Sequence, residues 1–310
     1  MKNQIFYPLI ASLTLWLAAS TAHGVLIAKE SFLDDGTTAG CYVNGQMTSG
    51  NNATVIVGNS GFSTENAWQN GTGSINVVGS SFSSTHLPSA ALQGSMRVTS
   101  YANNAIARNS SRQLATTPTL SATYYMSGLI SFSNGSLLND GDYVCVGFQG
   151  NDLSYNETSY SSGISYGLSR LGGSTYLSVF AGDSIYNLLD VTGTESSVTY
   201  QVVIQLTVDS SGNDILTVGY ADDSDESLVI ALSGTSVETW SGASSLSYLT
   251  AQAVTTGTST SSNVPTYFDE IYLGTALSDV TTFTSIPEAS TYSWLVGVFV
   301  LAFVYRRFRR

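Results

Sequence analysis

An alternation of apolar and polar residues with a period of two restricts the folds that this chain can adopt. It is clearest in the segment 198–208, where the apolar members are Val198, Tyr200, Val202, Ile204, Leu206 and Val208. This period places the apolar side chains on one face of an extended strand. Turn-forming residues follow at 209–213, and the apolar run 215–220 then returns. The pattern therefore predicts an antiparallel β-hairpin.

Similar strand-like segments recur between residues 25 and 284, separated by clusters of Gly, Ser, Asn and Asp. Helical periodicity is nearly absent, and no Pro-rich linker or charge block divides this region. Many short strands in one region of about 260 residues favour a single domain. We therefore expect residues 25–284 to form an all-β, two-sheet antiparallel sandwich of the jelly-roll type.

The N-terminal segment 1–24 has a different pattern. A basic residue, Lys2, precedes an apolar stretch that ends in the small residues around Ala22 and Gly24. This order is typical of a signal peptide, so we expect an N-terminal helix that signal peptidase removes by cleavage after Ala22 or Gly24.

The C-terminal segment 285–310 has three parts. A short motif at 286–289 contains Pro287 and Glu288, an uncharged stretch covers 290–305, and the chain closes with Arg306, Arg307, Arg309 and Arg310. The uncharged stretch has about the minimum length of a transmembrane helix. Because basic flanks stay on the cytoplasmic side, the main domain is expected on the opposite side of the membrane.

This tail resembles the PEP-CTERM sorting signal, in which a Pro-Glu-Pro-like motif, a hydrophobic helix and a basic cluster follow one another. Pro287 and Glu288 match the first two motif positions, whereas Ala289 stands where the second proline is expected. The resemblance implies recognition by an exosortase-type membrane protease and later release or transfer to the cell surface. A plain C-terminal membrane anchor has the same physical requirements and stays an alternative.

A second resemblance concerns the two ends of the main domain. The stretches 27–32 and 267–274 are similar to the first and last strands of bacterial surface proteins with a concanavalin A-like, or laminin G-like, jelly roll. The resemblance implies that the two stretches lie close together. Lectins, carbohydrate-binding modules, glycoside hydrolases and adhesion modules share this fold, so the fold alone does not define a function.

The charge balance excludes one class of partner. Residues 25–285 contain five basic and 21 acidic residues, a net charge of −16, and nucleic-acid binding requires clustered Lys and Arg. The obvious carboxylate pair is Asp269 and Glu270, but adjacent strand residues point to opposite faces. We therefore expect a solvated charge and an edge contact there instead of the facing acids of a glycosidase.

Two pairs of residues are candidates for binding or cross-linking. Trp68 and Trp240 lie in polar, loop-like segments, where an aromatic face can stack on a sugar, although packing is the alternative. Cys41 and Cys145 can form a disulfide in an exported protein. Cys145 also fits the alternative of a small buried apolar residue.

An acidic segment is the candidate metal site. Asp222, Asp223, Asp225 and Glu226 offer oxygen ligands of the kind that a structural Ca²⁺ prefers, but their spacing does not match an EF-hand. A solvated acidic turn is the alternative interpretation, and no other cofactor is expected.

These patterns lead to an expectation about function. We expect an exported protein, anchored by its C-terminal helix or released, that serves as a structural or interaction protein of the bacterial envelope or extracellular matrix and not as an enzyme. The alternative is a lectin-like carbohydrate-binding module with a polysaccharide as its partner. A glycoside hydrolase ranks third, because no facing pair of carboxylates can be named.

Overall fold

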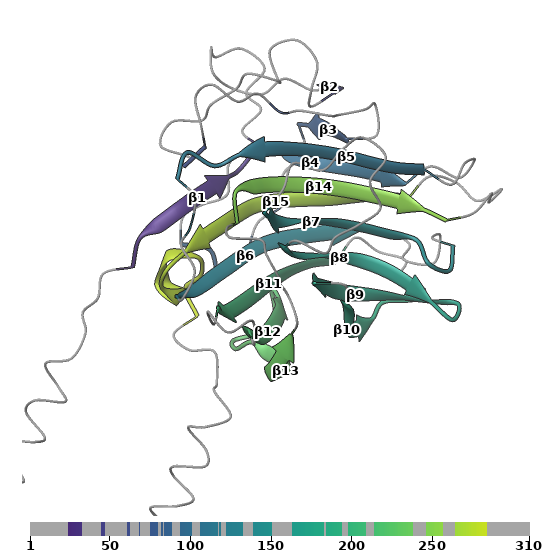
Figure 1. Ribbon diagram of the computed structural model, residues 1–310. Coiled ribbons are helices and arrows are strands. Elements are labelled where there is room, and N and C mark those ends of the chain that lie inside the picture. Colours follow the sequence, from purple (N-terminus) through teal and green to yellow (C-terminus); the bar gives the residue numbers. More distant parts are fainter. Residues whose placement is uncertain are drawn as a thin grey trace, which may run out of the picture.

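The alternating segments form fifteen strands in the described part of the chain, and these build two antiparallel sheets (Figure 1). The computed structural model describes residues 24–32, 45–46, 61–62, 68, 75–79, 82, 84–88, 94–100, 106–116, 118, 122–132, 139–150, 163–182, 184–193, 198–208, 214–237, 246–256 and 264–283. The all-β class and the two-sheet antiparallel architecture are therefore confirmed.

The larger sheet has nine strands in the order β13-β12-β11-β6-β15-β4-β3-β2, with β1 also paired to β15. Its strands are β1 (Leu26–Glu30), β2 (Gly45–Gln46), β3 (Ile75–Val78), β4 (Ser95–Ser100), β6 (Thr123–Phe132), β11 (Val198–Thr207), β12 (Asp214–Asp222), β13 (Val229–Val237) and β15 (Val264–Gly274). The hairpin predicted from the period of two is the pair β11 and β12, in which Ile204 lies opposite Val218.

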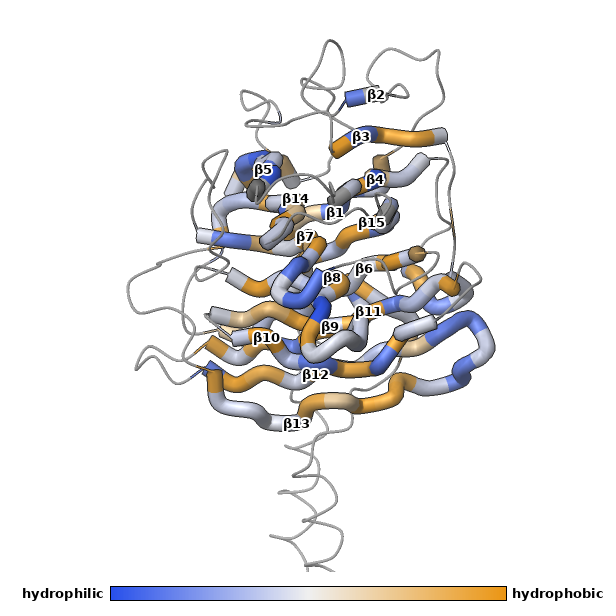
Figure 2. The backbone as a smooth tube through the Cα atoms, turned by 90° about the vertical axis from the view of Figure 1, so that its right-hand side faces the viewer, coloured by the Kyte–Doolittle hydropathy of each residue, from blue (hydrophilic) through white to orange (hydrophobic). Residues whose placement is uncertain are grey.

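The smaller sheet has six strands in the order β10-β9-β8-β7-β14-β5. Its strands are β5 (Ile106–Gln113), β7 (Tyr143–Gln149), β8 (Gly163–Leu171), β9 (Ser174–Ala181), β10 (Ser184–Asp190) and β14 (Tyr248–Thr255). Hydrophobic and hydrophilic residues follow each other along many strands of both sheets, as Figure 2 shows. This alternation gives each sheet one apolar face, which packs against the other sheet.

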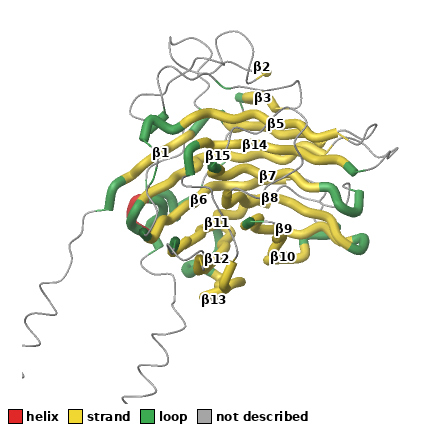
Figure 3. The backbone as a smooth tube through the Cα atoms, in the orientation of Figure 1, coloured by secondary structure: helices red, strands yellow, loops and turns green. Residues whose placement is uncertain are grey.

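The first and last strands are neighbours, as the resemblance of 27–32 and 267–274 implied. β1 pairs antiparallel with β15, with Lys29 opposite Tyr272 and Glu30 opposite Ile271. Helix is limited, in the described residues, to one short turn, η2 (Leu277–Asp279), which follows β15 (Figure 3).

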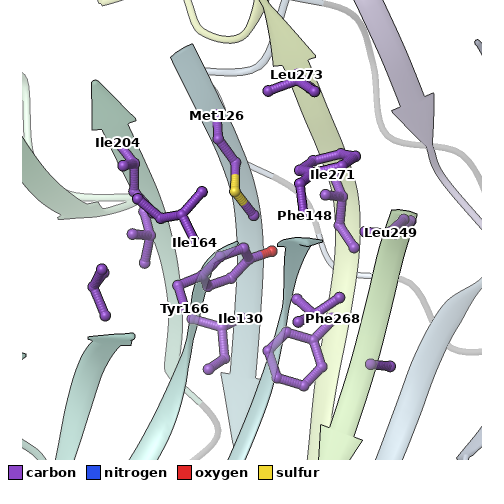
Figure 4. Close-up of a cluster of buried hydrophobic side chains, with 14 of the residues drawn as sticks. Met126, Ile130, Phe148, Ile164, Tyr166, Ile204, Leu249, Phe268, Ile271 and Leu273 are labelled. Carbon is purple, nitrogen blue, oxygen red and sulfur yellow. The ribbon is translucent and has the colours of Figure 1, made fainter. Parts of the chain in front are cut away.

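One hydrophobic core lies between the sheets. Figure 4 shows Met126 and Ile130 of β6 close to Tyr166 of β8 and Phe268 of β15, all buried. Tyr166 reaches across to the opposite sheet, where its hydroxyl donates a hydrogen bond of 3.4 Å to the carbonyl oxygen of Leu129. Gly128 makes room for this ring, because a Cβ at that position would lie 2.0 Å from the Tyr166 hydroxyl oxygen.

The chain folds back over the outer face of the nine-stranded sheet. Val280 packs there against Leu87 and Leu129, and the ring of Phe283 stacks on His86 with a centroid distance of 4.2 Å. Residues 84–88 and 275–283 therefore cover part of this face, and His86 packs within this cover.

Most of the predicted signal peptide and the whole predicted tail lie outside the described residues, and with them Pro287, Glu288 and the closing arginines. Within the described ranges, no helix is long and apolar enough to cross a membrane. The transmembrane helix at 290–305 and the sorting signal therefore stay predictions.

Candidate functional site

The outer face of the six-stranded sheet is lined by polar side chains. In β14, Leu249, Ala251 and Ala253 belong to the core between the sheets, so Thr250 and Gln252 point to the opposite side. The strand register extends this face across the sheet in both directions. The residues opposite Thr250 are Ser111 and Gly147, and those opposite Gln252 are Asn109 and Cys145, from β5 and β7 respectively.

The polar character continues toward the other edge of the sheet. Ser169 of β8 and Ser178 of β9 share this face, and their hydroxyl oxygens lie 2.7 Å apart. Both also lie close to Oδ1 of Asn187 on β10, at 3.2 and 3.1 Å. This side of the sheet therefore carries hydroxyl and amide groups from β5 to β10, most of them buried, whereas Asn187 is exposed.

Gln149, at the end of β7, is the most unusual residue of this face. Its side chain is fully buried, and both its Nε2 and Oε1 atoms have no hydrogen-bond partner among the described residues. The hydroxyl oxygen of Thr250, also buried, is in the same situation within the described part of the chain. Because a buried polar group without a partner costs about 1–3 kcal/mol, such atoms are rare in folded proteins.

Small residues beside Gln149 bring β7 and β8 close together. A Cβ on Gly163 would lie 2.2 Å from the carbonyl oxygen of Phe148 and 2.7 Å from Cγ of Gln149. Gly147, also on this face, would place a Cβ 2.6 Å from the hydroxyl oxygen of Ser165. The side chain of Gln149 therefore packs beside Gly163, where a Cβ would occupy the same space.

An aromatic cluster adjoins the polar residues on the same face. It consists of Tyr143, Cys145, Phe180 and Val254, with the rings of Tyr143 and Phe180 5.2 Å apart. Burial raises the pKa of the Cys145 thiol, and a hydrogen bond with Ser165 offsets only part of that effect. A thiol in this state is protonated at neutral pH and is not a nucleophile.

The structure answers part of the question about the cysteines. Cys145 is a free, buried thiol in the structure. Its suggested disulfide partner, Cys41, lies outside the described residues, so the pairing stays a prediction.

The expectation for Trp68 is corrected by its position. Only 2% of its surface is exposed, and it belongs to the hydrophobic core, where its ring lies 6.4 Å from that of Phe32. A buried ring cannot stack on a sugar, and a loop-like sequence did not reveal this burial. Trp240, the second candidate, lies outside the described residues.

The acidic segment Asp222 to Glu226 forms a turn that is held by its own carboxylates. Asp222 accepts a hydrogen bond of 2.8 Å from the backbone N–H of Ser224, and Asp225 accepts one of 3.0 Å from the N–H of Asp222. No group of three or more His, Cys, Asp and Glu side chains could hold a metal ion in the described part of the chain. The hydrogen bonds agree with the alternative of an acidic turn, which also contains the exposed Asp223.

The interpretation of Asp269 and Glu270 as solvated or edge charges is wrong. Both side chains are fully buried, because a β-bulge interrupts the pairing of β15 with β6 and Glu270 adopts a left-handed backbone with φ of 47°. Glu270 accepts a hydrogen bond of 2.6 Å from the Tyr272 hydroxyl and pairs with Lys29 at 3.2 Å. These carboxylates belong to the junction of β1 and β15, apart from the outer face of the six-stranded sheet.

Gln149 and Thr250 were not named from the sequence. The available signal was the alternation in 143–149 and 248–254, which places Tyr143, Cys145, Gly147 and Gln149 on one side of the strand. The alternation identifies a face, but it does not show that the face is buried or that its polar atoms have no partner.

Comparisons with known proteins found solved structures with a similar fold but no protein family. Neither a protein-family model nor a curated protein matches the chain. Among solved structures, the alginate lyase Aly36B is 13% identical, with 80% of this chain and 97% of that chain covered at a TM-score of 0.44. The PL-14 alginate lyase from Aplysia kurodai is 9% identical, with 80% and 98% covered at a TM-score of 0.43.

A third similar structure is the GH131 β-glucanase catalytic domain from Podospora anserina, with 11% identity, coverage of 67% and 81%, and a TM-score of 0.42. These proteins are enzymes that act on polysaccharides, and they overturn the expectation of a non-enzymatic structural or interaction protein. At these identities the likeness concerns the fold and does not transfer a site.

Proposed function

We propose that this protein is a carbohydrate-active enzyme that binds a polysaccharide across the outer face of its six-stranded sheet. The observation that carries the proposal is the buried amide of Gln149, whose donor and acceptor have no partner in the described residues, next to the similar hydroxyl of Thr250. Sugar hydroxyls both donate and accept hydrogen bonds, and an amide offers both functions. Few convergent polar groups on a largely preformed surface are typical of a binding site.

The fold supports an extended ligand. We assign the two-sheet sandwich to the jelly-roll, concanavalin A-like class, in keeping with the pairing of the first and last strands, β1 and β15. Six strands lying side by side, about 4.8 Å apart, form a face wide enough for several sugar rings.

The described residues of this face account for binding. A glycosidase requires two facing carboxyl groups. Within the described part of this face we find one carboxylate, that of Asp190 on the edge strand β10. Gln149 and Thr250 would orient the bound polysaccharide, and the uncharged thiol of Cys145 lies on the same face of the sheet.

A pair of glutamine variants tests the location of the site. Gln149→Ala should weaken polysaccharide binding about tenfold, the effect of one lost pair of hydrogen bonds. Gln201→Ala is the matched control, because Gln201 is equally buried but lies on the nine-stranded sheet. Affinity electrophoresis of the full chain in polysaccharide gels measures the binding, and release of reducing ends measures cleavage. Equal binding by Gln149→Ala and the wild type would refute this location.

The place of action is a separate proposal. We propose that the protein is exported and held at the membrane by the segment 290–305, with signal peptidase and an exosortase-type protease as its processing partners. The support is the sequence of the two terminal segments. Mass spectrometry of the protein from its native host should give an N-terminus after Ala22 or Gly24, and an intact Met1 would contradict export by cleavage.

A further inference from the structure

We infer that the polysaccharide bound by this face is uncharged, an inference that rests on the proposed function and specifies its substrate class. The positive charges of the domain support this inference. Residues 25–285 contain five basic residues, all of them in the described part of the chain: Lys29, Arg97, Arg108, Arg112 and Arg170. If the ligand were a polyanion, some of these residues should face it.

Two of the basic residues neutralise acids near β1. Arg112 lies in the core, where Nη1 is 3.2 Å from Oε2 of Glu30 and both side chains are 1% exposed. Lys29 pairs with Glu270 at 3.2 Å and lies over the ring of Tyr272. Their charges are therefore committed to the junction of β1, β5 and β15.

The other three basic residues also point away from the face. Arg108 of β5 lies opposite Ala253, a core residue, and is therefore on the inner side of the six-stranded sheet. Arg170 follows the outward-facing Ser169 and so points to the opposite side of β8, where it pairs with the exposed Asp140 at 3.6 Å. Arg97 belongs to the nine-stranded sheet.

The outer face of the six-stranded sheet therefore has no basic side chain among its described residues, in a region with a net charge of −16. A uronic-acid polymer carries one negative charge on each sugar, and this field would repel it. Each carboxylate of the polymer that becomes buried on binding would also lose its hydration without gaining a cationic partner. Neutral hydroxyl groups match the amides and hydroxyls of the face without that penalty.

A comparison of neutral and anionic polymers tests the inference. The full chain is run in gels that contain β-glucan or glucomannan as neutral polymers, or alginate or polygalacturonate as anionic polymers, at low and high NaCl. We expect a neutral polymer to retard the protein, with a dissociation constant that changes less than about twofold with salt. Alginate and polygalacturonate should not retard it.

The other outcomes separate the two proposals. Retardation by an anionic polymer that high salt abolishes would overturn the inference of an uncharged substrate. The effect of Gln149→Ala on that binding would still show whether the polymer binds on this face. Retardation by no polymer would overturn the proposed function and, with it, this inference.

A charge variant provides an independent measurement. Tyr248 is half-buried on β14 and lies opposite Gln149, so Tyr248→Lys places a cation beside the amide. We expect this variant to gain salt-sensitive alginate binding, and the control Tyr248→Gln to gain none. If Tyr248→Lys folds and binds the neutral polymer but still ignores alginate, the missing cation does not determine the substrate and the inference is overturned.

Discussion

Gln149 and Gln201 are both fully buried glutamines on strands, but their amides are in opposite situations. Gln201 donates to Thr281 Oγ1 at 3.2 Å and accepts from Ser84 Oγ at 3.3 Å. Gln149 has no partner among the described residues. The difference supports different roles: Gln201 connects three segments of the chain, whereas we propose that the Gln149 amide binds a ligand.

This difference predicts a contrast in stability. Gln201→Leu should lower the free energy of unfolding by about 1–3 kcal/mol, because partners are left unsatisfied. Gln149→Leu should leave it unchanged within about 1 kcal/mol or raise it, since a desolvated amide is replaced by an apolar group. Urea denaturation of both variants measures the contrast, and an equal loss in both would show that the Gln149 amide is also structural.

Gly128 is predicted to be essential for the contact of Tyr166 with β6. Gly128→Ala should destabilise the protein by about 1–3 kcal/mol, because the added methyl group overlaps the buried tyrosine ring. Combining it with Tyr166→Phe, which removes the hydroxyl 2.0 Å from that position, should recover part of the loss. A double-mutant cycle by thermal denaturation checks this, and strictly additive effects would contradict the proposed overlap.

Asp269 should make stability depend on pH. Burial raises the pKa of its carboxyl well above the usual range, and the negative charge of Glu270 adds to the effect. The folded protein therefore holds this proton more tightly than the unfolded chain, so the group favours folding below the unfolded pKa near 3.8 and that contribution is lost as the pH rises toward the folded pKa.

Asp269→Asn mimics the protonated acid and should remove this loss. Its stability relative to the wild type should increase with pH above about 4, by at most about 1.4 kcal/mol per pH unit. Asp222→Asn is the control, and its stability relative to the wild type should change with pH in the opposite direction. The reason is that hydrogen bonds from Ser224 lower the pKa of Asp222. A constant difference between Asp269→Asn and the wild type across pH 4–8 would mean that Asp269 is already ionised in the folded state.

At the scale of elements, β1 is tied to both sheets. It pairs with β15 in the nine-stranded sheet, and its Glu30 reaches Arg112 on β5 of the six-stranded sheet. Glu30 also accepts a hydrogen bond of 3.2 Å from the backbone N–H of Phe32. One side chain thus connects the first strand to the opposite layer.

Removing the ion pair between Glu30 and Arg112 should strongly reduce the stability of the protein. Glu30→Gln should destabilise the protein by about 3–5 kcal/mol, because the Arg112 charge loses its acidic partner in the core. Asp140→Asn, which breaks the exposed pair with Arg170, should cost about 0–1 kcal/mol. Chemical denaturation compares the two, and similar losses would show that burial does not determine the strength of these pairs.

The strands of this protein could be predicted from the sequence, because an alternation over 198–208 depends only on neighbouring residues. The bulge in β15 was missed, although a signal was present. Phe268, Ile271 and Leu273 are all buried core residues, and the step of three between the first two breaks a period of two. An added residue in the strand restores the register, which is why Asp269 and Glu270 are inside the protein.

At the scale of the whole molecule, the sequence predicted the sandwich but not the outer face on which we propose the site. The nine-stranded sheet is covered in part through contacts between distant segments, for example the hydrogen bond of 2.9 Å from the Thr281 hydroxyl to the His86 carbonyl oxygen. A pattern of neighbouring residues in the sequence does not predict a contact between segments that are so far apart in the chain. For the same reason, the burial of Trp68 and of the Gln149 amide could not be deduced from their neighbours in the sequence.

The net charge links the whole molecule to its proposed ligand. The acidic excess was visible in the sequence and excluded nucleic acids, but its meaning for a glycan depends on where the five basic residues point. The sheet register supplies that information, because it places them away from the outer face of the six-stranded sheet.

A crystal structure of the protein with an oligosaccharide from the neutral polymer that binds it best would test the proposal that the ligand lies on the outer face of the six-stranded sheet. We expect sugar rings over β7 and β14, with a sugar hydroxyl within hydrogen-bond distance of the Gln149 amide, at about 2.7–3.2 Å. An oligosaccharide bound over the nine-stranded sheet, or one that leaves both atoms of the Gln149 amide without a partner, would contradict it.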